Sequence, residues 1–298
     1  MRRALASLLL TLAMLLLGAG AARSETPGQI NSVERVPPAR IFEGIPADDA
    51  QFGTAVAILY RKNDGQRHIC TGVVVAPKKV LTAGHCGCGK ENTYWIHVRE
   101  DVRIPQDGNS TSVIGPPILF DSSICGTGRL AAGNDLALLH LEDEVRFAGK
   151  KPSYSFLSQT FDLRERLRRG SRVRAVGYGY TESHTIGVRL QADIPVWSAV
   201  CEERELAEIC SPFLEMVLSA SAGSRGISDT CGGDSGGPVF LIEGGGMELI
   251  AITSRGAPGM HADPSLGCGG GGIYTLLGRK KVQDWLAANG VVIKDDMP

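Results

Sequence analysis

The sequence lacks an excess of charge of either sign. Its 298 residues include 31 Lys and Arg against 32 Asp and Glu, so the formal net charge is −1 at pH 7. A chain with this balance has no general electrostatic attraction to nucleic acid or to acidic membrane surfaces. We therefore expect no nucleic acid among its partners, and charge does not single out any other partner.

Long apolar runs are almost absent, since only the N-terminus carries one. Two arginines precede an apolar stretch from Ala4 to Leu17, and small residues follow it. The stretch is shorter than the roughly 20 residues that a membrane span requires, and the order of its parts is typical of a secretory signal peptide. We interpret residues 1–22 as a signal peptide rather than a membrane anchor. The protein is then expected to be secreted, extracellular or periplasmic, with no membrane partner after signal removal.

The next segment, residues 23–40, offers no helix. It is polar, and it ends in the sequence "VERVPPAR". Pro37 and Pro38 keep this stretch extended, so Arg40 lies where proteases can reach it. We predict that residues 23–40 form a pro-segment.

Helical patterning is scarce in the rest of the chain. From Ile41 onward, short runs rich in Val, Ile and Leu are separated by turn residues, as in "TAVAILY", "DLALLHL" and "RVRAVGYGY". Runs of this length predict an all-β sandwich or barrel rather than βαβ units. The clearest helix is expected at residues 279–290, "RKKVQDWLAANG", where the apolar residues share one face and Asn-Gly supplies the stop.

The cysteines do not show the spacing of zinc ligands. In an exported chain an even set of cysteines favours disulfides, whereas a metal site at "HCGC", residues 85–88, would need convergent ligands that the sequence does not display. We therefore expect disulfides, no metal and no cofactor. The eight cysteines are Cys70, Cys86, Cys88, Cys125, Cys201, Cys210, Cys231 and Cys268.

Three polar motifs follow one another along the chain. "LTAGHC" contains His85, "GNDLALLHL" contains Asp135, and "GGDSGGP" presents Ser235 in a glycine-rich turn. Hydrolysis of a peptide needs a nucleophile, a base, a group that orients the base, and donors to the oxyanion. The three side chains are candidates for the first three roles, and the amides of Gly233 and Ser235 for the donors. Each motif alone is more often structural, but the set in this order is a much stronger signal.

With these motifs the sequence resembles the trypsin-like serine endopeptidases of the chymotrypsin family. The resemblance runs from "IFEG" at Ile41 to the helix after Arg279. It implies an all-β fold of two antiparallel six-stranded β-barrels, with the active site between them and a C-terminal α-helix. The expected halves are residues 41–158 and residues 159–298.

The resemblance also assigns roles to the three motifs. It implies Ser235 as the nucleophile, His85 as the general base and then the general acid, and Asp135 as the group that fixes the imidazole tautomer. It implies the bridges Cys70–Cys86 and Cys231–Cys268. Cys201 has a match in the family but Cys210 falls too early, so these two are expected to close a small local loop. Cys88 and Cys125 have no usual counterpart, and pairing them is the remaining option.

A further implication of the resemblance is a zymogen. In the family, cleavage after a basic residue frees an Ile ammonium that pairs with the aspartate before the nucleophile, which here means Arg40, Ile41 and Asp234. A buried carboxylate without a partner costs about 3–5 kcal/mol, so Asp234 needs a cation on physical grounds as well. The expected partners are an activating protease, protein or peptide substrates, and protein inhibitors.

Substrate preference follows from the residues that match the family's pocket. Asp229 stands where trypsin-like members carry an aspartate, Ser254 matches the serine behind the pocket, and Gly256 and Gly272 match its small wall positions. A buried carboxylate at the end of an open slot selects a long cation, so cleavage after Arg or Lys is predicted. The alternative is that Asp229 is a solvated loop acid.

Two departures from the family pattern leave other functions open. Arg255 replaces the usual Trp, and a long loop carrying Met260, His261 and Asp263 follows it up to Cys268. This extra cation would either weaken the binding of Arg or attract acidic residues of a protein substrate. The alternatives are therefore the same mechanism with altered specificity, or a catalytically silent binding module on the same fold.

Overall fold

The computed structural model describes most of the chain that follows the expected pro-segment. The described residues are 41, 44–103, 110–126, 133–145, 155–156, 160–218, 228–257 and 268–292. The expected signal peptide, the pro-segment with Arg40, and the loop that carries Met260, His261 and Asp263 lie outside this range. No helix among the described residues is long and apolar enough to cross a membrane.

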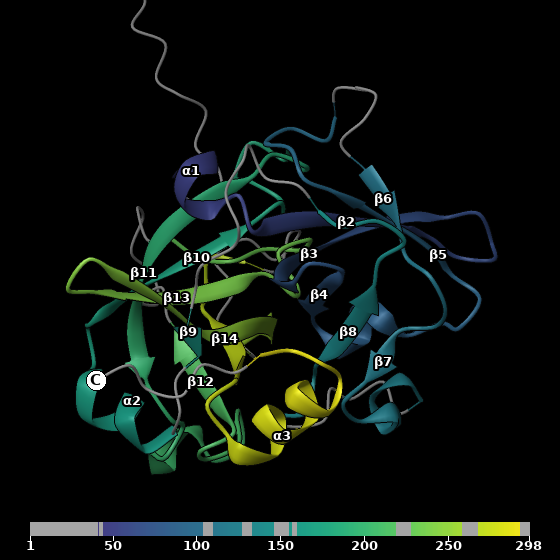
Figure 1. Ribbon diagram of the computed structural model, residues 1–298. Helices are drawn as coiled ribbons and strands as arrows, with labels where there is room; N and C mark the ends of the chain where they lie inside the picture. Colours follow the sequence, from purple (N-terminus) through teal and green to yellow (C-terminus); the bar gives the residue numbers. More distant parts are fainter. Residues whose placement is uncertain are drawn as a thin grey trace, which may run out of the picture. The chain divides into compact units, whose positions relative to one another are not determined.

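The first half forms a curled antiparallel sheet in the order β6-β5-β2-β3-β4-β8-β7 (Figure 1). Beyond the ladders, one bridge between Val113 and Leu141 brings the chain after β6 to the chain after β8. Among the described residues the sheet therefore curls back on itself with a bridge, and no continuous ladder, at its seam. Its strands are β2 (Ala55–Arg61), β3 (Arg67–Ala76), β4 (Lys79–Thr82), β5 (Thr93–His97), β6 (Ser110–Ser112), β7 (Ile118–Leu119) and β8 (Ala137–His140).

The second half forms a closed barrel. Its strands follow the order β11-β10-β13-β14-β15-β12, and β12 pairs with β11 to close the ring. A short β1 pairs with β11, and β9 runs parallel to β14. The expected all-β fold is confirmed, with closure by continuous ladders in this half. The strands are β1 (Ile45–Pro46), β9 (Ser155–Phe156), β10 (Arg172–Gly177), β11 (Leu190–Ser198), β12 (Glu215–Leu218), β13 (Pro238–Glu243), β14 (Gly246–Gly256) and β15 (Gly272–Leu276).

Helices are short and few among the described residues. The expected C-terminal helix is confirmed as α3 (Lys280–Ala288), which buries Val282 and Leu286. These two side chains belong to the core of the first half, and Trp285 packs edge-on against Phe120 at 5.4 Å between ring centroids. The last helix therefore packs on the first half, although it follows the strands of the second half in the sequence. The others are α1 (Asp49–Phe52), α2 (Thr160–Arg166) and the 3₁₀ turns η1 (Gly84–Gly87), η2 (Ser122–Cys125) and η3 (Arg204–Leu206).

The two halves meet along β3. The Thr71 backbone N–H donates to the Ser235 carbonyl at 2.8 Å, and the Thr71 hydroxyl donates to the Gly233 carbonyl at 2.9 Å. The Tyr178 backbone N–H donates to the same hydroxyl at 3.0 Å. One buried threonine of the first half thus fixes the glycine-rich turn of the second half.

All four expected disulfides are present. They join Cys70 to Cys86, Cys88 to Cys125, Cys201 to Cys210, and Cys231 to Cys268. The predicted disulfides are confirmed, and both cysteines of the "HCGC" motif are used in bridges.

Candidate active site

His85 lies in the 3₁₀ turn η1 that follows β4. The turn packs closely because Gly84 has no side chain: a Cβ there would overlap Ile124 of η2 and meet the Leu136 backbone. Cys86 is disulfide-bonded to β3. The sequence "AGHC" thus combines a glycine for close approach with a covalent tie, and the imidazole between them remains 29% exposed.

Asp135 orients this imidazole from a fully buried position just before β8. Its Oδ1 accepts the backbone N–H of His85 at 2.8 Å, and its Oδ2 lies 2.9 Å from His85 Nδ1. The hydroxyl of Ser254 on β14 donates to the same Oδ2 at 2.6 Å. With Nδ1 as the donor to a carboxylate, Nε2 is left as the acceptor.

The hydrogen bonds around Asp135 keep its carboxyl ionised. Burial is the largest single influence and acts to raise the pKa of Asp135. The hydrogen bond and charge of His85, together with the hydrogen bond from Ser254, outweigh burial and hold this pKa below its ordinary value. The site therefore has a buried anion directly behind the imidazole.

Ser235 lies in a turn that is pressed against the histidine loop. Gly236 has φ +84°, and a Cβ there would overlap the Thr71 carbonyl and the Thr82 hydroxyl. The Ser235 carbonyl lies 3.7 Å from Cys86 Sγ, next to His85 in the sequence. Within the described ranges no hydrogen bond joins the Ser235 hydroxyl to His85, and such bonds are often loose without substrate.

The backbone amides of the turn around Ser235 differ in whether they have an acceptor. The N–H groups of Asp234, Gly236 and Gly237 all donate to backbone carbonyls. By contrast, no acceptor for the N–H of Gly233 or Ser235 lies among the described residues. Gly233 has φ +98°, and a Cβ there would lie 2.9 Å from Gly179 Cα, so only glycine fits this turn.

Asp234 is buried without a cation among the described side chains. Its Oδ1 accepts the Gly179 N–H at 2.7 Å and its Oδ2 accepts the Cys231 N–H at 2.8 Å. Burial raises the pKa of Asp234 to about 7. Ile41 is also fully buried, in the core of the second half, with φ +38°. A β-branched residue in this left-handed region is strained.

Asp229 is likewise fully buried, which rules out a solvated loop position. Its Oδ2 accepts the N–H groups of Gly269 and Gly271 at 2.8 and 2.9 Å, and its Oδ1 accepts the Thr230 N–H at 2.8 Å. Burial raises the pKa of Asp229 to about 6. No described cation pairs with this carboxylate.

Two glycines line up beside this acid. Gly256 of β14 is paired with Gly272 of β15. A Cβ on Gly272 would lie 2.7 Å from the Tyr274 hydroxyl, which is itself 2.8 Å from the Thr230 hydroxyl. The predicted wall positions are thus adjacent, and at Gly272 packing against Tyr274 requires the absence of a side chain.

Arg255 is neutralised by a residue that the sequence reasoning missed. Its Nη1 and Nη2 donate to Glu215 Oε1 and Oε2 at 2.6 and 3.0 Å. Glu215 is fully buried, and the Arg255 side chain is 21% exposed. An acidic residue opening the apolar run "EMVL" was the only signal available. The guanidinium is therefore not a free cation at the mouth of the pocket.

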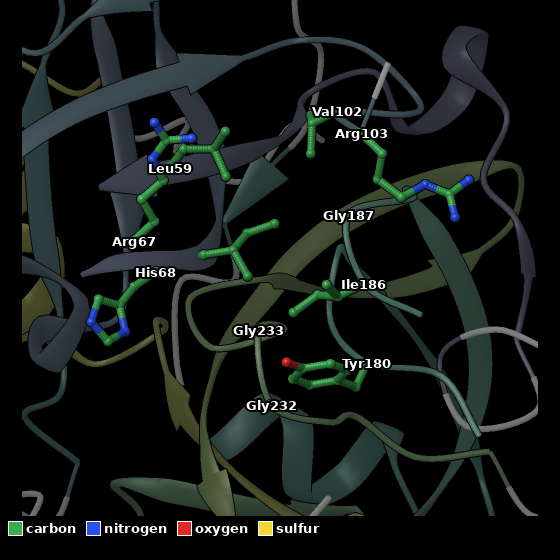
Figure 2. A pocket seen from close by; sticks show the side chains of 11 residues that line it. Leu59, Arg67, His68, Val102, Arg103, Tyr180, Ile186, Gly187, Gly232 and Gly233 are labelled. Carbon is green, nitrogen blue, oxygen red and sulfur yellow. The ribbon is translucent and has the colours of Figure 1, made fainter. Parts of the chain in front are cut away.

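A second missed feature is an open cavity of about 670 Å³ next to Gly233. Figure 2 shows Leu59 and Val102 on one side of it and Ile186 and Tyr180 on the other. Its lining is mainly apolar, and its basic Arg103 is bonded twice to Asp101, at 2.9 and 2.6 Å. The remaining lining residues are Arg67, His68, Ile69, Gly187 and Gly232.

Comparison with known proteins identifies the family of this chain. The family model described as Trypsin matches residues 41–285. CLIP domain-containing serine protease B4 of Anopheles gambiae is 27% identical over 273 residues, 84% of this chain and 70% of the relative. Chymotrypsin-like elastase family member 3B of Homo sapiens is 27% identical over 228 residues, 73% of this chain and 79% of the relative. The chain belongs to the trypsin family of serine proteases.

Proposed function

We propose that this protein is a secreted serine endopeptidase, made as a zymogen, that hydrolyses peptide bonds after Arg or Lys. The observation that carries the proposal is the buried Asp135, which holds His85 by two hydrogen bonds beside the turn of Ser235. A nucleophile, a base, a group that orients the base and two backbone N–H donors are the parts that acyl transfer needs.

The chemistry proceeds in two steps. Ser235 Oγ attacks the substrate carbonyl carbon while His85 Nε2 takes its proton, and the carbonyl oxygen becomes an oxyanion facing the amides of Gly233 and Ser235. The tetrahedral intermediate collapses, His85 gives the proton to the leaving amine, and an acyl-enzyme on Ser235 remains. Water then attacks the ester carbonyl with His85 again as base, which frees the acid product and restores Ser235. Asp135 stays ionised throughout and stabilises the imidazolium.

Asp229 supports the preference for Arg and Lys. Its carboxylate is buried beside the adjacent glycines 256 and 272, and no cation among the described residues pairs with it. The pairing of Arg255 with Glu215 favours this assignment over altered specificity, because it removes the free charge that would repel a cationic side chain. The curated relatives include an elastase by name, so the specificity rests on the pocket of this chain.

Asp234 and Ile41 support activation by cleavage after Arg40. In the uncut chain the Asp234 carboxyl has only backbone donors among the described residues, and Ile41 has a strained φ of +38°. A cut at Arg40 creates an ammonium on Ile41 that can pair with Asp234. The N-terminal signal peptide and the pro-segment belong to the same proposal, with an activating protease and protein inhibitors as partners.

The proposal is tested with protein released to begin at Ile41 and a matched peptide panel with Arg, Lys, Phe, Leu or Glu before the cut. The Ser235→Ala variant serves as blank. We expect hydrolysis only after Arg and Lys. Hydrolysis after another residue would refute the assignment of Asp229 and leave the mechanism, whereas no hydrolysis above the blank and no labelling of Ser235 by a phosphonate probe would indicate a binding module.

A further inference from the structure

Glu215 is the acceptor for four donors, which is the full capacity of a carboxylate in a buried site. Its Oε1 accepts from Arg255 Nη1 and from the Gly133 backbone N–H at 2.9 Å. Its Oε2 accepts from Arg255 Nη2 and from the Ser211 backbone N–H at 2.9 Å. A carboxylate used in this way holds its partners in one arrangement.

One of these partners belongs to the loop that carries Asp135. Gly133 lies two residues before Asp135, with φ +65°, and a Cβ on it would overlap Leu214. Its N–H is held by Glu215, and its carbonyl accepts from Arg279 Nη2. Residues of the second half therefore hydrogen-bond to both the N–H and the carbonyl of Gly133.

Arg255 is also linked to Asp135 through the Ser254 hydroxyl. Its Nη1 lies 3.4 Å from the Ser254 hydroxyl oxygen, and the Ser254 hydroxyl donates to Asp135 Oδ2 at 2.6 Å. A cation near the oxygen of Ser254 favours the orientation in which that oxygen accepts and its proton points to Asp135.

We propose that the Arg255–Glu215 pair is a positioning element for Asp135, acting through the Gly133 backbone and through the Ser254 hydroxyl. This inference rests on the proposed function, since it assigns the pair a part in setting the geometry of His85. It accounts for a cation at a position where the family resemblance implies tryptophan. The pair does not contact the reacting atoms and is not itself catalytic.

The test replaces both members with methionine, Arg255→Met with Glu215→Met. Exchanging a buried ion pair for apolar residues is often neutral for stability, but the Gly133 and Ser211 N–H groups also lose their acceptor. This double variant is therefore expected to fold with a lowered Tm. We expect kcat to fall about 10- to 100-fold, because small displacements of a catalytic group have effects of this size. KM should change far less than kcat.

A matched control is the pair Arg174 and Asp193 between β10 and β11, which is also bidentate, at 2.7 Å for both contacts. Arg174→Met with Asp193→Met should leave kcat unchanged. Combining Arg255→Met with Glu215→Gln keeps one amide oxygen for the Gly133 N–H, and it should recover part of the lost kcat. An unchanged kcat in the Met pair, or an equal loss in the control, would overturn the proposal.

A second readout does not depend on turnover. The downfield proton resonance of the His85 Nδ1–H bonded to Asp135 should move upfield in the Met pair and stay in place in the control. An unmoved resonance in the Met pair would contradict the inference. If the parent protein hydrolyses no peptide, the proposed function fails, while this resonance still decides whether the pair positions Asp135.

Discussion

Two regions of the site shift the pKa values of buried aspartates in opposite directions. Asp135, Asp229 and Asp234 are all fully buried. Asp135 has an imidazole and a hydroxyl as partners, and its pKa lies below the ordinary value. The partners that the described residues offer to Asp229 and Asp234 are backbone amides, and burial raises their pKa values to about 6 and about 7. Equal burial thus gives one anion that is already paired and two carboxyls that have no cation within the described part of the chain.

This difference agrees with the role that each acid has in the proposed mechanism. A carboxylate that orients a base must be ionised before substrate arrives. The hydrogen-bond donors around Asp135 favour its ionised form. A carboxyl that receives a cation gains most when that cation supplies the missing partner. We expect the substrate side chain to complete Asp229 and the Ile41 ammonium to complete Asp234.

The largest expected effect comes from removing the charge of the paired acid. Asp135→Asn keeps the shape but makes the group a donor to Nδ1, which favours the wrong imidazole tautomer. A loss of about 10⁴-fold in kcat is expected for such a change in this kind of triad. Single-turnover acylation of Ser235 at pH 8 checks it, with Asp193→Asn as a surface control. Retention of kcat would show that Asp135 does not orient His85.

The next largest effect is expected from a substitution at Asp229. Asp229→Ser should remove the preference for Arg and Lys, with a loss of about 2–5 kcal/mol in their transition-state binding. The kcat/KM values for Arg and Leu substrates measure this change. A preference that survives the substitution would move the specificity to another residue.

The pKa of Asp229 predicts how the affinity for cations depends on pH. Because burial raises this pKa to about 6, the carboxyl is neutral below pH 6 and ionised above it. A small aryl amidine should therefore bind more weakly by about tenfold for each pH unit below that value. Calorimetric titration between pH 4.5 and 8 follows the change, and an affinity independent of pH would contradict the assignment of Asp229 as its partner.

Asp234 should make stability depend on pH differently before and after the cut. Its pKa in the uncut fold is raised from 3.8 to about 7. The folded state then binds the proton more tightly than the unfolded state, so this contribution to stability is complete below pH 3.8 and is lost as the pH rises to about 7. The full loss is roughly 4 kcal/mol. Pairing with the Ile41 ammonium should remove this loss in the cut protein.

Urea unfolding of both forms at pH 4 and pH 7.5 measures this difference. The stability of the cut form relative to the uncut form should increase with pH. Asp234→Asn in both forms is the control, because it should abolish the pH dependence of that difference. Parallel stability curves in the parent pair would argue against a link between Ile41 and Asp234.

The smallest expected effect concerns the disulfide that joins Cys88, the residue after η1, to Cys125 of η2. Replacing Cys88 and Cys125 with serine removes a tie between the histidine turn and the segment that packs on Gly84. A loss of about 2–4 kcal/mol in unfolding free energy is expected. Melting curves of the oxidised protein measure it, and the Cys201 and Cys210 pair replaced in the same way gives a comparison far from His85.

The sequence predicted those candidate site residues that lie in short contiguous motifs. His85, Asp135 and Ser235 stand in short segments whose glycines and cysteines have readable roles, and the structure brings their loops together. The disulfide partners followed from the family pattern and from the pairs it left over. The all-β fold followed from short apolar runs.

The rest depends on contacts between residues far apart in the chain. Glu215 meets Arg255 across a separation of 40 residues, and Thr71 meets Gly233 across 162. Neither contact leaves a periodic or spaced pattern in the sequence. The incomplete ladder at the seam of the first sheet, and the packing of α3 on that half, are likewise results of tertiary packing.

The most direct test of the account compares the uncut precursor with protein that begins at Ile41, using one Arg substrate and one Leu substrate at pH 8. The account predicts hydrolysis of the Arg substrate by the cut protein alone, because only then do both Asp229 and Asp234 have cations. Equal activity of the precursor, or faster hydrolysis of the Leu substrate by the cut protein, would contradict it.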